Sequence, residues 1–378
     1  ISQEALSKVK PVFIKSNSKN KNLRVKIASS IDKVEVFGEK ITRNIHYTKD
    51  VKSYGDSKKI VFNCRGKSLV SRQNNKKILF ASLTSPKNIL KMGDNNYRGS
   101  LNIIKTPGKT GCDVVNIVPL ESYLKTLLSK EMNSSWHLEA LKAQAVAART
   151  YAYHKMNLQQ ARSSSFFDLE SSEKHQVSGS LKDITKKTSF ATNQTKGMIL
   201  VTNKDELTPI FFHAQCGGRT LLPEKVWKNH VEGYQEVTCK SCLSRKKTKW
   251  NTKLSLFKFK QFLRWVIKKS ELNIANLDFN KKILIAPDNK NYDSFRVYLG
   301  EKVIIINKVL MRKYFGRVKV PSHNYIIGLN KYIEIRGKGN GHGVGMCQVG
   351  ALDLARSNLN FKKILKFYYP NHKIKKLY

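Results

Sequence analysis

The segment "VNIVPLESYLKTLLSKEMNSSWHLEALKAQAVAARTYAYHKM", residues 115–156, predicts two helices joined by a short turn. Pro119 suits the first turn of a helix, because an amide proton is not needed there. Apolar residues recur at helical spacing after it, at Leu120, Tyr123, Leu124 and Leu127. We expect this helix to end near Glu131 and Met132, since the polar "NSS" that follows is rich in turn and cap formers.

The second helix should begin after Ser135 as its N-cap, and its surface is nearly bare of large side chains. Alanines allow another backbone to approach closely, and they lie at Ala140, Ala143, Ala145, Ala147, Ala148 and Ala152. Glu131 is therefore expected at a junction, beside the apolar Met132 and Trp136. Apolar surroundings raise the pKa of a carboxyl group and keep it protonated, as a general acid requires. The alternative is an ordinary surface glutamate.

The rest of the chain predicts an α+β protein with mixed sheets and packed helices. Residues 1–20 are polar and rich in lysine, and we expect them to be partly disordered. Short strands are indicated over residues 22–105 by alternating apolar positions, among them Val25, Ile27, Val34, Val36, Ile60, Phe62 and Leu79. An amphipathic helix is predicted at residues 256–270, strands at "SFRVYLG" and "KVIIINKVL", and a last helix before Pro370.

The net charge of +43 indicates a polyanionic partner, such as nucleic acid, anionic lipid or an acidic polysaccharide. Because the lysines are scattered, the alternative is that they only solvate the surface. No nucleic-acid-binding module is recognisable, so we expect no nucleic-acid partner. No run approaches the roughly 20 apolar residues of a membrane-spanning helix, so no such segment is expected. The first residue is Ile1 rather than methionine, which is compatible with removal of a leader.

A second stretch, "RGKGNGHGVGMCQVGALDLA" at residues 336–355, has glycine at every second position from Gly337 to Gly345. Together with "PLESYLKTLLSKEMNSSWHLEALKAQAVAARTYA", it resembles the SpoIID/LytB family of stage II sporulation proteins D and amidase enhancers. A "YYP" near the C-terminus, and the pieces "YRGSLNI", "FFHAQCGGRT" and "SFRVYLG", follow the family order. The resemblance covers residues 97–378 and implies a SpoIID-like catalytic core there, after a strand-rich region at residues 1–96.

The resemblance implies a lytic transglycosylase acting on peptidoglycan strands that an amidase has stripped of stem peptides. It would cleave between N-acetylmuramic acid (MurNAc) and N-acetylglucosamine (GlcNAc) and leave 1,6-anhydroMurNAc ends. The family's catalytic acid maps onto Glu131, whereas Glu121 and Glu139 are expected to be surface or capping residues. The alternative is a non-catalytic, glycan-binding enhancer of an N-acetylmuramoyl-L-alanine amidase. Either function places the protein outside the cytoplasm, in the periplasm, the cell envelope or the medium.

The alternating glycines would let main-chain amides lie against a flat sugar ring, where any Cβ would clash. The predicted substrate-binding residues are His342, Gln348, Gly339, Gly341, Gly343, Arg149 and Gln144. We expect Glu131 to face the Gly337–Gly345 segment in one groove. Two alternatives are a glycine-rich turn packed for structural reasons and a phosphate loop, although the Lys–Ser/Thr pair of such loops is missing.

Four residues have the spacing of a zinc ribbon. His213, Cys216, Cys239 and Cys242 give H-x2-C-x22-C-x2-C, and two closely spaced pairs can hold one tetrahedral ion. We therefore predict a closed, structural Zn²⁺ site in the loop at residues 213–242. The alternative is a disulfide, since a wall-acting enzyme works in an oxidising compartment. The remaining cysteines, Cys64, Cys112 and Cys347, are expected to be small buried fillers.

Overall fold

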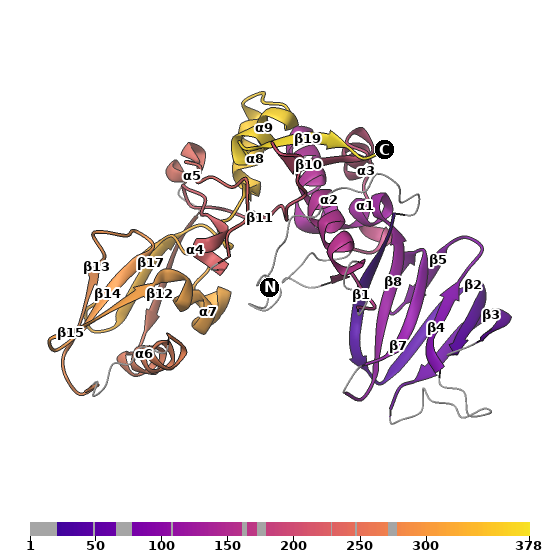
Figure 1. The fold of residues 1–378 in the computed structure, drawn as a ribbon, viewed down its shortest axis with the longest axis horizontal. Coiled ribbons are helices and arrows are strands. Elements are labelled where there is room, and N and C mark those ends of the chain that lie inside the picture. The colour runs from indigo at the N-terminus through magenta and orange to yellow at the C-terminus, as the bar shows by residue number, and fades with distance from the viewer. Residues whose placement is uncertain are drawn as a thin grey trace. The chain divides into compact units, whose positions relative to one another are not determined.

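A computed structural model describes residues 21–47, 50–65, 78–106, 109–160, 165–171, 179–227, 229–245, 248–270 and 278–378. The polar segment at residues 1–20 lies outside them. The chain forms two compact units: unit 1 comprises Ile1–Ile210 with Lys373–Tyr378, and unit 2 comprises Phe211–His372 (Figure 1). Both units contain helices and sheets, which confirms the predicted α+β class.

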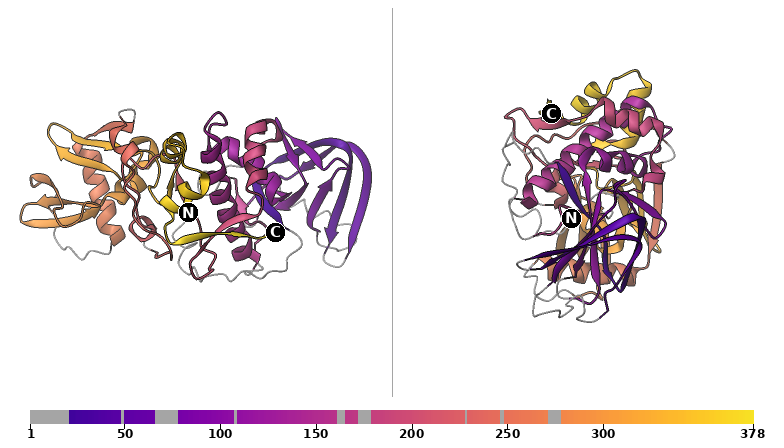
Figure 2. Two further views of the ribbon diagram at one scale, coloured as in Figure 1. Left: turned by 90° about the horizontal axis from the view of Figure 1, so that it is seen from above. Right: turned by 90° about the vertical axis from the view of Figure 1, so that its right-hand side faces the viewer.

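Unit 1 is built on a nine-stranded sheet that curls around its own apolar side chains (Figure 2). Its strands are β1 (Asn22–Ile31), β2 (Lys33–Tyr47), β3 (Val51–Asn63), β4 (Ile78–Thr84), β5 (Ile89–Met92), β6 (Asn95–Arg98), β7 (Ser100–Lys105), β8 (Cys112–Pro119) and β9 (Leu169–Glu170). The order is β6-β5-β2-β4-β7-β8-β1-β9, with β3 paired to β2. The predicted alternation is confirmed at Val34, Val36, Ile60 and Phe62, which are all buried in this core.

The helices of unit 1 follow this sheet: α1 (Leu120–Glu131), α2 (Leu138–Gln160), the short 3-10 helix η2 (Leu181–Asp183) and α3 (Lys186–Gln194). Strand β10 (Met198–Thr202) then pairs with the C-terminal β19 (His372–Lys376). Helix α1 begins after Pro119 and ends at Glu131, as predicted. The start of α2 differs from the prediction, because the amide of Ser135 donates to Asn133 Oδ1 instead of opening the helix. His137 takes the capping role, since its Nδ1 accepts the amide of Glu139 at 3.3 Å.

A buried ion pair joins α1 to α2. The Arg149 guanidinium, whose side chain is 0% exposed, donates from Nε and Nη2 to the two carboxylate oxygens of Glu121, both at 2.9 Å. The same guanidinium donates to the carbonyls of Thr192 and Met198, which come from α3 and β10. Burial alone would raise the pKa of Glu121, but the hydrogen bonds and charge of Arg149 outweigh it and hold that pKa below its ordinary value.

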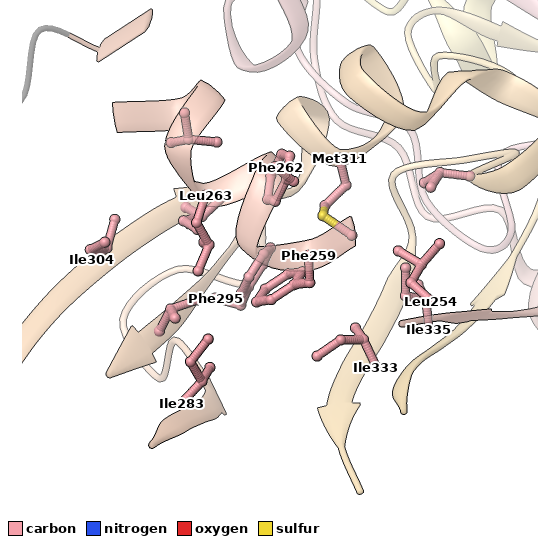
Figure 3. Packing of buried hydrophobic residues seen from close by; sticks show 14 of the residues in the cluster. Leu254, Phe259, Phe262, Leu263, Ile283, Phe295, Ile304, Met311, Ile333 and Ile335 are labelled. Atoms are coloured by element: carbon pink, nitrogen blue, oxygen red, sulfur yellow. The ribbon is translucent and has the colours of Figure 1, made fainter. Parts of the chain in front are cut away.

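Unit 2 contains two three-stranded sheets, in the orders β12-β17-β16 and β13-β14-β15. Their elements are β12 (Lys249–Leu254), α6 (Leu256–Ser270), β13 (Ile283–Pro287), β14 (Ser294–Leu299), β15 (Lys302–Asn307), α7 (Lys308–Lys319), β16 (Tyr325–Leu329) and β17 (Ile333–Lys338). The predicted amphipathic helix is α6, and Figure 3 shows Phe259 and Phe262 of this helix within the core between the sheets. The core also takes Phe295 from β14 and Ile335 from β17.

Shorter elements complete unit 2 around its cysteines: β11 (Phe212–His213), α4 (Pro223–Trp227), α5 (Lys240–Ser244), β18 (Met346–Cys347), α8 (Gln348–Arg356) and α9 (Phe361–Tyr368). Strands β11 and β18 pair in parallel, which sets His213 beside Cys347. The predicted last helix is α9, which ends before Pro370. None of the helices in the described ranges has both the length and the apolar character needed to cross a membrane.

A disulfide between Cys64 and Cys112 closes a loop with a sequence separation of 48 residues in unit 1. The expectation that these two cysteines are unlinked fillers is therefore wrong. The bond connects the end of β3 to the start of β8, which meet because Cys112 lies opposite Ile31 of β1 and Asn63 lies opposite Lys33 of β2. A loop of this length restricts the unfolded chain strongly.

Replacing both Cys64 and Cys112 with alanine should destabilise unit 1, because the unfolded chain regains the entropy of the open loop. Loop-closure theory gives a loss of about 4 kcal/mol for this separation. Urea unfolding of the wild type and the double variant, followed by far-UV circular dichroism, measures the difference. An unchanged midpoint would show that the loop is already restricted in the unfolded chain.

His154 lies inside unit 1 on α2, with 1% of its surface exposed. Neither ring nitrogen has a hydrogen-bond partner among the described residues. Burial, and secondarily the charge of Lys155, lowers the pKa of His154 to about 3. The folded protein therefore keeps this imidazole neutral at pH values where the unfolded chain protonates it.

Stability should fall with acidification because the unfolded His154, with an ordinary pKa of about 6.5, binds a proton that the folded one refuses. The stabilisation that comes from keeping His154 neutral is fully present above about pH 6.5. It is lost as the pH falls towards 3, at roughly 1.4 kcal/mol per pH unit. His154→Gln should make the stability of unit 1 less dependent on pH by one proton between pH 6 and pH 4. Urea unfolding at several pH values checks this, and equal slopes for both proteins would contradict it.

Candidate functional site

Glu131 is the last residue of α1, and its side chain is partly exposed. The next residue, Met132, is buried, and its amide still donates to the Leu128 carbonyl, so the helix end is fixed. The following turn is also ordered, because the Trp136 amide donates to the Asn133 carbonyl at 3.0 Å. The carboxyl group thus stands at a rigid junction between α1 and the turn, as the sequence predicted.

A buried tyrosine lies close to this carboxyl group. Tyr123, which precedes Glu131 on α1, is 1% exposed. Burial raises the pKa of Tyr123 well above its ordinary value, and the negative charge of Glu131 is the next contributor. The phenol therefore stays neutral beside the carboxyl group. The carboxyl group of Glu131 thus has a buried, uncharged neighbour on its protein side.

Two residues that the sequence assigned to substrate binding lie inside unit 1. Gln144 and Arg149 are both 0% exposed on α2. The Arg149 guanidinium is committed to Glu121 and to main-chain carbonyls, so no donor is left for a sugar. This placement supports a structural role for Arg149, and it makes Glu121 an internal partner and not the surface residue that was expected.

The glycine segment of unit 2 is packed against the protein's own chain. A Cβ on Gly339 would lie 2.7 Å from the Gln215 carbonyl oxygen, and one on Gly345 would lie 2.0 Å from that of Phe211. Both glycines have positive φ, at +92° and +70°. The amides of Gly339 and Gly341 donate to the carbonyls of Thr248 and Pro321. Since these groups are already satisfied, the geometry favours the structural alternative over a bare surface for a sugar ring.

Gly343 and its neighbour His342 are less enclosed. A Cβ on Gly343 would meet only Leu221, at 3.4 Å, although its φ is +81°. The His342 ring is half-buried, and its Nδ1 accepts the amide of Val344 at 3.1 Å. Burial, followed by the neighbouring His213, holds the pKa of His342 well below its ordinary value, so the ring is neutral. A substrate contact at His342 remains a prediction.

His342 also belongs to an aromatic group. Its ring centroid lies 5.0 Å from that of Trp227 and 6.3 Å from that of Phe211. Gln348, the other polar residue predicted to bind substrate, is buried at the first position of α8. Glu131 belongs to unit 1 and the glycine segment to unit 2, so a shared groove remains a prediction.

Four buried thiols converge in unit 2. The sulfur atoms of Cys216, Cys239, Cys242 and Cys347 all lie within 4.8 Å of one another. Four thiolates at 2.3 Å from a tetrahedral zinc ion stand about 3.8 Å apart, so a small contraction would fit this set to the ion. The Sγ atoms of Cys242 and Cys347 are already 3.6 Å apart.

The main chain directs hydrogen-bond donors at these sulfurs. The amides of Cys216 and Gly350 both lie 3.3 Å from Cys347 Sγ, and the amide of Gly218 lies 3.4 Å from Cys216 Sγ. The Tyr368 hydroxyl is 3.5 Å from Cys239 Sγ. Donors placed around sulfur favour the thiolate, which is the form that binds a metal ion.

The cluster differs from the predicted ligand set at one position. His213 was expected as the fourth ligand, but the four converging ligand atoms are all sulfurs, and His213 lies beside them on β11 with its Nδ1 3.1 Å from the Val344 carbonyl. Cys347, which was expected to be a filler, supplies the fourth sulfur. It reaches the others because β11 and β18 pair in parallel, a contact that spacing along the chain could not reveal.

Comparison with known proteins finds similarity to stage II sporulation proteins and to an amidase enhancer. A family model described as stage II sporulation protein matches residues 108–201, which include α1, Glu131 and α2. An uncharacterized protein of Brachyspira hyodysenteriae is 35% identical over 281 residues, covering 72% of this chain and 70% of that protein.

Two Bacillus subtilis proteins are also similar. The amidase enhancer is 26% identical over 335 residues, covering 76% of this chain and 45% of that protein. Stage II sporulation protein D is 25% identical over 287 residues, covering 70% of this chain and 77% of that protein. Together with the relative that is 35% identical, these matches show that the chain belongs to the stage II sporulation protein D (SpoIID) family.

Proposed function

We propose that this protein is a peptidoglycan lytic transglycosylase and that Glu131 is its general acid and base. The substrate would be a MurNAc–GlcNAc strand without stem peptides, and the product would carry a 1,6-anhydroMurNAc end. The observation that carries the proposal is the position of Glu131: a partly exposed carboxyl group at the fixed end of α1, beside the neutral Tyr123. The segment that matches the family model contains it.

One carboxyl group is sufficient for this reaction. The protonated Glu131 donates its proton to the glycosidic oxygen as the bond from that oxygen to C1 of MurNAc breaks. The resulting carboxylate then takes the proton from the C6 hydroxyl while the C6 oxygen bonds to C1. The glutamate ends protonated, as it began, and no water is consumed. A second carboxylate, which hydrolysing glycosidases need to activate water or to attack C1, is not required.

Three observations support a location outside the cytoplasm and a link to an amidase. The Cys64–Cys112 disulfide is of the kind that persists in oxidising compartments. The amidase enhancer of Bacillus subtilis is among the similar proteins. Removal of stem peptides by an amidase leaves a lactyl carboxylate on each MurNAc, and a chain with a net charge of +43 attracts such a polyanion.

The second candidate is a non-catalytic enhancer that binds glycan and stimulates an amidase. The similarity to the amidase enhancer favours it. The two functions differ in one simple respect, because only the enzyme releases anhydro ends from purified strands when no amidase is present.

Glu131→Gln should lower cleavage of amidase-treated peptidoglycan by about 10²–10⁴-fold, because the amide keeps the shape of the side chain but cannot donate the proton. Mass spectrometry of 1,6-anhydroMurNAc ends, with the amidase removed beforehand, measures the rate. Strand binding and the unfolding midpoint should stay close to those of the wild type.

Glu139→Gln is the matched control, since Glu139 pairs with Lys142 on α2 and has no proposed catalytic role. This variant should cleave at the wild-type rate. Activity of Glu131→Gln within threefold of the wild type would transfer the acid role to another residue. If the wild type itself releases no anhydro ends but accelerates an added amidase, the enhancer function holds instead.

We further propose that Cys216, Cys239, Cys242 and Cys347 hold a structural Zn²⁺ ion. The four sulfurs fit a tetrahedral site, and four protein ligands leave no open position for chemistry. The ion would stabilise the segment between Cys216 and Cys239, which contains only the short helix α4. The disulfide alternative is less favoured, because all four thiols are free while Cys64 and Cys112 are bonded.

Elemental analysis of protein purified without chelators should find one zinc per chain. Cys347→Ser should lose the zinc and lower the melting temperature, whereas His213→Gln should keep it, because the four sulfurs already complete a tetrahedral site. If His213→Gln loses the zinc and Cys347→Ser keeps it, the ligands are the ones that the sequence predicted, with His213 in place of Cys347. Absence of zinc together with oxidised thiols would decide for disulfides.

A further inference from the structure

A pocket of about 720 Å³ lies within unit 2, and Gly337 and Lys338, at the start of the glycine segment, are among its lining residues. Such a volume is in the range of small-ligand sites. It is lined by four cationic side chains, Arg219, Lys249, Arg336 and Lys338, and none of the described residues that line it is acidic. The pocket therefore favours an anionic ligand on charge alone.

Three of the four positive residues, Lys249, Arg336 and Lys338, come from the outer face of the β12-β17-β16 sheet. Its inner face carries residues such as Leu254, Ile333 and Ile335, which are buried in the core with α6. Side chains alternate along a strand, so the residues between them point the other way. Register pairs Lys249 with Lys338 and Asn251 with Arg336 on that outer face, and Arg336 with Ile326 of β16.

Lys249 and Lys338 stand directly opposite each other on neighbouring strands. Like charges in that position destabilise a sheet. Arg219 is compensated by Glu236 and Asp293, and Arg336 by Glu334. Neither lysine forms an ion pair with any acid in the part of the chain that the structure describes. The two ammonium groups thus provide uncompensated positive charge at the wall of a pocket.

The remaining lining is suited to a sugar rather than to a small inorganic anion. Leu243 and Ile326 are 49% and 63% exposed, and they offer apolar surface to the C–H face of a ring. The side-chain amide of Asn251 adds a polar group that can pair with hydroxyl or N-acetyl groups, whereas the amide of Asn324 is already bonded to Gly217 and Tyr292. Apolar walls with a few polar groups are typical of sites for organic ligands.

We propose that this pocket is an accessory subsite for a denuded glycan strand, in which Lys249 and Lys338 bind the lactyl carboxylate of a MurNAc residue. The inference rests on the proposed function, because that function supplies the polyanionic strand. It assigns the preference for stripped strands to a defined place in unit 2, and not to the net charge of the whole chain. Peptide-bearing MurNAc lacks the free carboxylate and would lose this contact.

The test is a binding measurement on the Glu131→Gln chain, so that cleavage cannot interfere. Isothermal titration with a denuded MurNAc–GlcNAc tetrasaccharide is compared with titration by the neutral tetramer of GlcNAc, at several salt concentrations. Lys249→Ala/Lys338→Ala should weaken binding of the denuded tetrasaccharide at least tenfold and reduce its salt dependence. Affinity for the neutral tetramer should stay within twofold, because it has no carboxylate.

Lys253→Ala/Lys258→Ala is the matched control. Lys253 lies on the same face of β12 but outside the pocket, and Lys258 is exposed on α6. This pair removes the same charge and should change affinity by less than twofold. Equal losses in both double variants would show that overall charge, and not the pocket, attracts the strand.

Two further outcomes bear on the ligand. If a single-stranded oligonucleotide of equal charge binds as tightly and depends equally on Lys249 and Lys338, the pocket is a general polyanion site and the proposal is wrong. If the pocket variant loses affinity for the neutral tetramer as well, the carboxylate contact is wrong. Binding is measured without cleavage. If the wild type lacks transglycosylase activity, the enzyme function is refuted, but the binding comparison still tests the pocket.

Discussion

The bidentate ion pair between Glu121 and Arg149 is the contact on which the candidate catalytic region of unit 1 depends. Arg149 is fully buried, and it connects the first turn of α1 to α2, α3 and β10 through one planar group. The amide of Gly197 and the hydroxyl of Tyr378 also donate to the Glu121 carboxylate. Removing one partner of such a pair leaves a buried charge without compensation, which typically costs about 3–5 kcal/mol. This contact therefore joins α1, α2, α3 and β10.

The Glu121–Arg149 ion pair helps to fix the position of Glu131 from the other end of α1. Helix α1 is rigid over its 12 residues, and the ion pair holds its first turn. Glu131 lies at the opposite end, about 15 Å along the axis at 1.5 Å per residue. The buried residues of the helix extend from Leu120 to Leu128, while its last residue, Glu131, is partly exposed. A general acid needs both conditions, a fixed position and access to the substrate.

Local patterns predicted the helices well and contacts between distant residues poorly. Apolar spacing gave α1 and α6 almost residue by residue, because helices are decided by neighbours three and four positions apart. The cap of α2 was misplaced, because the chain makes a further turn in which the Ser135 amide bonds to Asn133, and His137 accepts the Glu139 amide where α2 begins. The disulfide and the fourth cysteine of the cluster were missed for a different reason: both join segments that only the folded sheets bring together.

The glycine segment shows that one motif can have more than one physical reason. Its alternation was interpreted as a bare surface for a sugar, yet Gly339 and Gly345 admit the carbonyls of residues 215 and 211. That close approach allows β11 to pair with β18 and brings Cys347 to Cys216. The buried glycines therefore support the proposed metal site, whereas a substrate contact at Gly343 and His342 remains a prediction.

Charge offers a parallel case. An excess of 70 basic over 27 acidic residues attracts any polyanion and selects none. Selection requires a place where positive charge is concave, uncompensated and next to apolar surface, because there an anion loses water and a ring can pack. Lys249 and Lys338 meet that requirement at a cost, since their opposition on adjacent strands destabilises the sheet. A ligand that carries a carboxylate on a sugar ring would offset this cost, which is why we place specificity at the pocket and only long-range attraction in the rest of the surface.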